Sequence, residues 1–158
     1  MTYFETEGRG NINKTLELVK RIAEELGIKH IVVASTSGFT AEKALETLTD
    51  LGVSLSVVGT ERSRFASDVL KKLEDNGHVV CFSREVPSDY PDTASLAFRR
   101  FSQGVKVAVQ IAVIAAEKKL VSTEEDVISI GKWDTALIVK PSDKFAELKV
   151  RELICMPR

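Results

Sequence analysis

Short apolar segments rich in Val and Ile alternate with helical segments along the first half of the chain. The segments His30–Ala34, Val53–Val58 and His78–Phe82 are continuous apolar runs of strand length. Before the first of them, apolar residues such as Leu16 and Val19 recur at helical spacing. Continuous apolar strands that alternate with helices are typical of a mainly parallel sheet with helices on both faces. The sequence therefore predicts an α/β fold.

Capping residues, glycines and prolines set the predicted element boundaries. The tight turn at Gly131–Thr135 implies at least one antiparallel strand near the end of the chain. The segment Ser83–Thr93 contains two prolines and is expected to be irregular, as a lid or as a plain crossover. No linker or repeat divides residues 1–158, so one domain is expected. The predicted helices run from Asn11 or Asn13 to Leu26, over Thr40–Leu51 and Ser63–Asp75, and over Thr93–Leu120 with a break near Ser102–Gly104; the remaining predicted strands are Val127–Ile130, Ala136–Val139 and Leu148–Ile154.

Charge and cysteine content exclude several classes of function. The 158 residues carry a net charge of −1, without a basic stripe that would indicate nucleic acid or an anionic membrane surface as a partner. The two cysteines are far apart in a sequence without a recognisable export signal, which favours reduced thiols and a cytoplasmic location. Neither histidine has neighbours at metal-ligand spacing, so no metal site is predicted. The apolar run Val107–Ala116, interrupted by Gln110, is too short to span a bilayer; it is expected in the core, with a subunit interface as the alternative.

The segment Ser35–Ala41 is the strongest indication of a ligand. Hydroxyl residues and Gly38 join an apolar strand to the start of a helix. The first N–H groups of a helix have no partner within it, and the helix dipole adds partial positive charge there. Gly38 lets the backbone approach a ligand closely. The loop therefore indicates a phosphate-bearing small molecule, and a plain turn with a helix cap is the alternative.

Other candidate residues follow the remaining strands. Arg62 suits a phosphate, or is a solvated charge in the first turn of a helix. Trp133 suits stacking on a planar ring, or covers the end of the core. Ser102 and Gln103 are placed either to bond a ligand or to form a helix junction around Gly104. No nucleophilic triad or dyad is recognisable.

Several separated motifs resemble one family. Residues 32–41 resemble the phosphate loop of the C-terminal α/β domain of pyruvate kinase, although Thr36 stands where that enzyme often has lysine. Residues 101–107, 134–136 and 148–152 are similar to stand-alone relatives of that domain, found mostly in archaea. The resemblance covers nearly the whole chain. It implies a three-layered fold with a mostly parallel sheet and one antiparallel strand, and no pyruvate kinase activity, because the catalytic barrel is lacking.

The resemblance also implies a ligand, flavin mononucleotide (FMN), and a set of contacts. Phosphate contacts would come from Ser35, Thr36, Ser37, Gly38 and Thr40, and Phe39 or Trp133 would border the ring. A small-molecule binding protein is the leading hypothesis. The alternatives are an enzyme acting on a phosphorylated metabolite or a flavin-dependent oxidoreductase, with Lys106 as a candidate polar group, and a regulatory or assembly module forming a homo-oligomer. Outside the loop, the predicted site residues are Thr60, Arg62, Ser102, Gln103, Gly131, Trp133, Asp134 and Thr135.

Overall fold

The fold is built on one seven-stranded sheet, with the strand order β1-β7-β6-β5-β2-β3-β4. The computed structural model describes the whole chain, residues 1–158. All strands point the same way except β6, which is antiparallel to both of its neighbours, β5 and β7. The predicted α/β architecture with at least one antiparallel strand is thus confirmed. The strands are β1 (Thr2–Phe4), β2 (His30–Ala34), β3 (Ser54–Gly59), β4 (Val79–Phe82), β5 (Val127–Lys132), β6 (Thr135–Lys140) and β7 (Lys149–Pro157).

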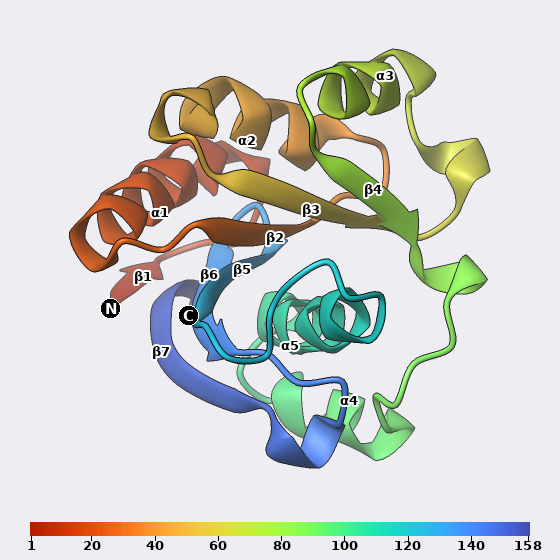
Figure 1. Cartoon of the computed structure of the whole chain (residues 1–158). Helices are drawn as coiled ribbons and strands as arrows, with labels where there is room; N and C mark the ends of the chain where they lie inside the picture. The colour runs from red at the N-terminus through yellow and green to blue at the C-terminus, as the bar shows by residue number, and fades with distance from the viewer.

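Helices cover both faces of the sheet and complete three layers. Figure 1 shows α1, α2 and α3 together on one face and α4 and α5 on the other. Their bounds are α1 (Ile12–Leu26), α2 (Phe39–Leu48), α3 (Ser67–Asp75), α4 (Asp92–Phe98) and α5 (Gln103–Glu117). No helix combines the length and the apolar composition that crossing a membrane requires.

The order of the strands creates a switch point beside β2. From β2 the chain moves outward through β3 to β4, and it then returns over the opposite face through α4 and α5 to β5. Strands β3 and β5 lie on either side of β2 and run parallel to it. In open sheets of this kind, ligands bind beyond the carboxyl ends of the strands at such a switch point. The topology alone therefore points to the end of β2.

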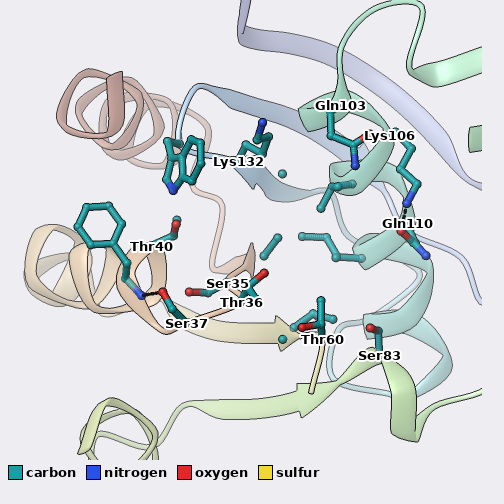
Figure 2. A pocket seen from close by; sticks show the side chains of 18 of the residues that line it. Ser35, Thr36, Ser37, Thr40, Thr60, Ser83, Gln103, Lys106, Gln110 and Lys132 are labelled. Carbon is teal, nitrogen blue, oxygen red and sulfur yellow. Dashed lines mark hydrogen bonds between the residues drawn. The ribbon is translucent and has the colours of Figure 1, made fainter. Parts of the chain in front are cut away.

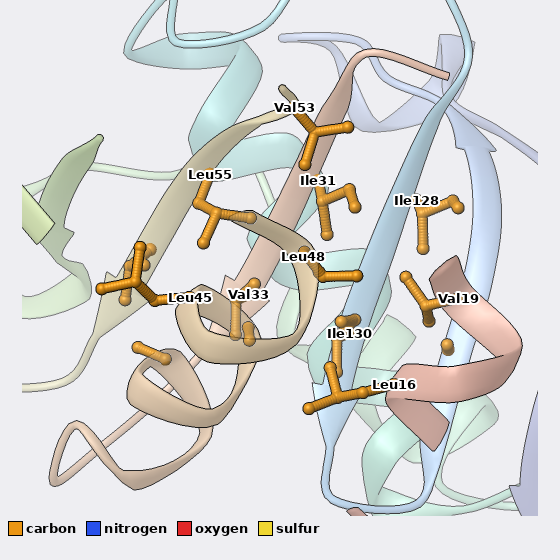
Figure 3. Close-up of a cluster of buried hydrophobic side chains, with 14 of the residues drawn as sticks. Leu16, Val19, Ile31, Val33, Leu45, Leu48, Val53, Leu55, Ile128 and Ile130 are labelled. Carbon is orange, nitrogen blue, oxygen red and sulfur yellow. The ribbon is translucent and has the colours of Figure 1, made fainter. Parts of the chain in front are cut away.

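The larger core cluster lies between the sheet and the layer formed by α1, α2 and α3. Leu16 of α1 and Leu48 of α2 are fully buried against the sheet. Figure 3 shows Leu16 beside Ile130 of β5 and Leu48 near Ile31 of β2. Burying one such side chain stabilises a fold by about 1.5–3 kcal/mol. This cluster fixes α2, and with it the loop that precedes α2, on the end of β2.

Helix α5 forms the core of the opposite face. Most residues of Val107–Ala116 are buried within the chain, so the predicted core position of this run is confirmed. The Ser129 hydroxyl on β5 donates a hydrogen bond of 2.7 Å to the carbonyl of Ala108, which ties the helix to the sheet. The side chain of Ser102 accepts from the N–H of Val105 at 3.1 Å and so defines where α5 begins.

Several predicted boundaries were wrong. The third helix begins at Ser67 rather than Ser63, because residues 62–64 form a separate 3₁₀ turn. The second helix ends at Leu48, and another 3₁₀ turn continues to residue 51. Asn11 occupies the cap position of α1, but its side chain donates to the carbonyl of Thr6 instead of capping the helix. The irregular segment after β4 is shorter than predicted, because α4 begins at Asp92 and 83–85 form a 3₁₀ turn.

Candidate functional site

A cavity of about 400 Å³ opens at the carboxyl ends of β2, β3 and β5. This volume lies in the range of small-molecule sites in proteins, roughly 300–1,000 Å³. The loop before α2 and the first half of α5 form its two long walls, as Figure 2 shows. The cavity therefore occupies the switch point that the topology predicts.

The loop before α2 offers unpaired donors to this cavity. Gly38, the N-cap residue of α2, has a φ of 101°, in the left-handed region. The backbone N–H groups of Thr36, Ser37, Gly38 and Thr40 have no acceptor within the chain. These groups add to the positive end of the α2 dipole, a combination that binds anions. The loop is thus built as the sequence predicts, with donors available to a ligand.

Neighbouring contacts hold the loop in this shape. The Oγ of Ser35 accepts from the N–H of Ala41 at 3.3 Å, and Ala66 N–H donates to the Ser37 carbonyl at 2.9 Å. A Cβ at Gly38 would stand 3.2 Å from the side chain of Val69. Gly38 therefore lies against Val69 of α3 and is not among the residues that line the cavity. A larger residue at Gly38 would strain the left-handed backbone and press against Val69. Such a substitution would disturb the folded loop itself, so it is a poor test of ligand binding.

The cavity is lined by cations and contains no carboxylate. Arg9, Lys106 and Lys132 line it, and no Asp or Glu is among the lining residues. Glu7 lies outside the lining, with 3.9 Å between its Oε2 and the Nζ of Lys132. Hydroxyls of Thr60 and Ser83 add polar groups to the lining, and Thr60 Oγ1 is buried without a hydrogen-bond partner. The electrostatic character of the cavity suits an anionic ligand.

Aromatic and aliphatic side chains provide the rest of the wall. Phe39 and Trp133 are half-buried at the mouth, and both also pack against the larger core cluster. The guanidinium of Arg9 lies 4.6 Å from the ring centroid of Phe39 and 5.5 Å from that of Trp133. Val107 and Ile111 of α5 line the interior. Both predicted roles of Trp133 are thus compatible with its position.

Helix α5 presents a polar row to the cavity. Gln103, Lys106 and Gln110 all line it, and Figure 2 shows them across the cavity from Ser35 and Ser37. Burial lowers the pKa of the Lys106 ammonium, and the nearby charge of Arg99 lowers it further. The Nζ of Lys106 donates to Oε1 of Gln110 at 2.8 Å.

The structure brings most of the predicted site residues together. The predicted residues that line the cavity are Ser35, Thr36, Ser37, Phe39, Thr40, Thr60, Gln103, Gly131 and Trp133.

Besides Gly38, four predicted residues lie outside the lining. Arg62 stacks over the ring of Phe82, with 4.7 Å to its centroid, and is exposed beside Glu85. Ser102 caps α5. Asp134 and Thr135 are buried; the Asp134 carboxylate accepts from the N–H of Gly8 at 2.9 Å and from the Thr135 hydroxyl. Each of these four side chains therefore makes its contacts within the chain and outside the cavity.

Some lining residues were not predicted. Arg9 reaches the cavity from the segment before α1, and nothing in its local sequence marks it. Lys132 precedes Trp133 in the turn and could have been included with it. Gln110 did carry a signal, because it is the one polar residue in the apolar run of α5. A polar residue on a helix that is otherwise apolar indicates a buried polar partner or a cavity.

No cluster of His, Cys, Asp and Glu side chains is arranged to hold a metal ion. Comparison with known families agrees with the α/β architecture of the sheet and its helices. Residues 13–139 match the family described as the pyruvate kinase alpha/beta domain. The match spans most of the 158 residues and includes α2, α5 and every strand that borders the cavity. The chain belongs to the pyruvate kinase alpha/beta domain family.

Proposed function

We propose that this protein binds a phosphorylated small molecule at the loop before α2, and that the ligand is FMN. The observation that carries the proposal is the set of unpaired N–H groups at Thr36, Ser37, Gly38 and Thr40, at a helix N-terminus inside a cation-lined cavity. Unpaired donors at a helix start are matched by phosphate oxygens, which accept several hydrogen bonds at once. The buried and unpartnered hydroxyl of Thr60 supports a polar occupant as well.

The remaining lining fits the other parts of FMN. Phe39 and Trp133 offer aromatic faces at the mouth, and Val107 and Ile111 offer aliphatic surface inside. Planar rings bind well between such surfaces, since apolar area is buried and ring stacking adds to it. The ring would lie against these side chains while Ser37 and its neighbours hold the phosphate.

A binding role is favoured over acid–base catalysis by the composition of the lining. The cavity contains no carboxylate, imidazole or thiol, the groups that most often transfer protons in enzymes. Bound FMN would itself supply redox chemistry, so a flavin-dependent oxidoreductase is the second candidate function. Lys106 is the polar side chain placed to meet such a ligand. Reduction of the bound flavin by a nicotinamide cofactor, followed by reoxidation with a substrate, would favour that second candidate.

Trp133 provides the test, because it is the only tryptophan of the chain and it lines the cavity. FMN is titrated against the Trp133 fluorescence and compared with riboflavin, which lacks the phosphate. We expect tight quenching by FMN, much weaker quenching by riboflavin, and displacement of FMN by inorganic phosphate. Ser37→Asp, which adds a negative charge at the anion site, should abolish FMN binding.

A matched control is available on α3. Ser67 is exposed at the start of that helix and lies outside the cavity, so Ser67→Asp adds the same charge at another helix N-terminus. This variant should bind FMN as the unmodified protein does. Equal affinity for FMN and riboflavin, or unchanged FMN binding in Ser37→Asp, would refute the assignment of the phosphate to this loop.

A further inference from the structure

We infer that the cavity has a second recognition site, formed by Gln103, Lys106 and Gln110 of α5. The free polar atoms of this site are hydrogen-bond donors, so it binds acceptor atoms of its ligand. This inference rests on the proposed function, in which the loop before α2 holds a phosphate. It specifies the ligand class as a phosphate monoester whose far end carries a carboxylate or a ring edge with carbonyl oxygens. We call these three residues the α5 donor row.

Helix geometry aligns the α5 donor row. Positions 103, 106 and 110 are separated by three and four residues, so their side chains share one face of the helix. All three line the cavity, and Figure 2 shows them on the side opposite the loop residues Ser35 and Ser37. A ligand whose phosphate lies at the loop therefore extends toward this row.

The hydrogen bonds already present fix which atoms of the row remain free. The Oε1 of Gln103 accepts from Nε of Arg99 at 2.7 Å, and Oε1 of Gln110 accepts from Nζ of Lys106 at 2.8 Å. Arg and Lys side chains can only donate, so each glutamine must turn its oxygen to its neighbour. The amide nitrogens of Gln103 and Gln110 are left as donors, as are the two remaining protons on the Lys106 ammonium.

The charge of Lys106 has no partner in the chain. Lys106 is half-buried and forms no ion pair, whereas Lys132 has Glu7 at 3.9 Å. Burial and the charge of Arg99 both disfavour the ammonium form of Lys106. An anionic or strongly accepting group on a ligand would relieve this cost, since a half-buried cation gains most from a partner where water is partly excluded.

Val107 and Ile111 of α5 line the same cavity and add apolar surface beside the α5 donor row. The preferred ligand thus has a phosphate at one end, hydrogen-bond acceptors at the other, and apolar ring surface next to those acceptors. The two carbonyl oxygens at the dione edge of a flavin, which flank its N3–H, and the oxygens of a simple carboxylate both supply such acceptors. A simple sugar phosphate lacks this combination, because it has no apolar ring face to lie against Val107 and Ile111.

The experiment measures affinity by quenching of Trp133 fluorescence with defined probes. In the unmodified protein, 4-carboxyphenyl phosphate is compared with phenyl phosphate, which lacks the far acceptor. FMN and inorganic phosphate are then titrated into Lys106→Met, which keeps the length of the side chain and removes its charge. Lys118→Met is the matched control, since Lys118 lies at the end of the same helix and outside the cavity.

The α5 donor row predicts that Lys106→Met weakens FMN binding about ten- to a hundredfold and leaves inorganic phosphate unchanged. Lys118→Met should change neither. The unmodified protein should prefer the carboxylated probe, and Lys106→Met should lose that preference. If FMN and both phenyl probes bind equally well with and without the Lys106 ammonium, the second site is refuted while the phosphate loop stands. If no phosphate probe binds the unmodified protein, the proposed function itself fails, and the inference fails with it.

Discussion

The carbonyl oxygen of Gly104 occupies the place that a Cβ on Gly131 would need. The first turn of α5 therefore lies directly against the backbone of β5, at the point where a register shift between residues 130 and 132 interrupts the pairing of β5 with β6. A Cβ on Gly104 would in turn overlap the side chain of Thr135. This contact sets how far α5 stands from the sheet, and so it positions Gln103 and Lys106 over the cavity.

Gly131→Ala is therefore expected to destabilise the protein by at least about 2 kcal/mol, because the helix must move away from the strand to make room. Chemical denaturation measures the change in the free energy of unfolding. Gly10→Ala is the control, since a Cβ there meets nothing within 4 Å and the backbone is not in the left-handed region. It should change stability by less than about 1 kcal/mol. Equal stability of the two variants would mean that α5 and β5 do not pack this closely.

The start of α5 also depends on its cap. Ser102→Ala removes the acceptor for the Val105 N–H and should cost about 1 kcal/mol of stability. Ser67→Ala makes a suitable comparison, because Ser67 begins α3 without a side-chain cap bond, and it should cost less than about 0.5 kcal/mol. Thermal melts of the two variants separate these effects. A Ser102→Ala protein as stable as Ser67→Ala would argue against the cap.

The fold could be predicted from the sequence to the extent that it depends on local patterns. The apolar run after Gly27 predicted the bounds of β2 correctly. The short turn between β5 and β6 predicted that these two strands are antiparallel. The strand β1 was missed, because its three residues form a strand by pairing with β7 at the far end of the chain. The end of β7 at Pro157 was missed for the same reason, since this part of β7 is the partner of β1.

The site shows the same division between local and distant effects. The loop before α2 is a local structure, a strand followed by hydroxyls and a glycine, and it was recognisable. Arg9 lines the cavity because the segment that precedes α1 packs beside it. The buried Asp134 carboxylate holds this segment by accepting a hydrogen bond from the N–H of Gly8. That contact joins positions 126 residues apart, and no local pattern encodes it. Asp134, which was predicted as a site residue, lies outside the cavity lining and holds this segment in place.

Cys155 should make stability depend on pH in the alkaline range. Its thiol is fully buried and donates to the hydroxyl of Thr15 at 3.8 Å, and burial raises its pKa from 9.0 to about 11. In the unfolded chain the thiol loses its proton near pH 9, whereas in the folded chain it keeps the proton until about pH 11. The raised pKa therefore contributes stability that is complete below pH 9 and is lost as the pH rises to about 11.

The size of this effect is about 3 kcal/mol, since the pKa is raised by about two units and each unit corresponds to roughly 1.4 kcal/mol. Denaturation of the unmodified protein and of Cys155→Ala is compared between pH 8 and pH 11. The alanine variant is less stable at pH 8 because a buried side chain has been shortened, and it should lose less stability as the pH rises. Parallel pH profiles for the two proteins would show that Cys155 does not titrate with a raised pKa.

Ser37→Asp should affect stability and binding in opposite directions. Ser37 is exposed next to the N-cap of α2, and its Oγ is 3.4 Å from the Phe39 N–H that it accepts from. A carboxylate here would interact with the unpaired N–H groups and the positive end of the helix, which stabilises the ligand-free protein by about 0.3–1 kcal/mol. The same charge would repel a phosphate, so inorganic phosphate should raise the melting temperature of the unmodified protein but not that of Ser37→Asp.

Thermal denaturation at constant ionic strength, with chloride replaced by phosphate, measures both effects, because constant ionic strength holds general screening fixed. Two opposite shifts from one substitution distinguish an anion site from a structural defect, since a damaged loop would lower stability both with and without phosphate. If Ser37→Asp melts lower than the unmodified protein without phosphate, the N–H groups at the start of α2 are not available as donors. If phosphate stabilises both proteins equally, the anion binds elsewhere in the cavity, where Arg9 and Lys132 are the nearest remaining cations to the mouth.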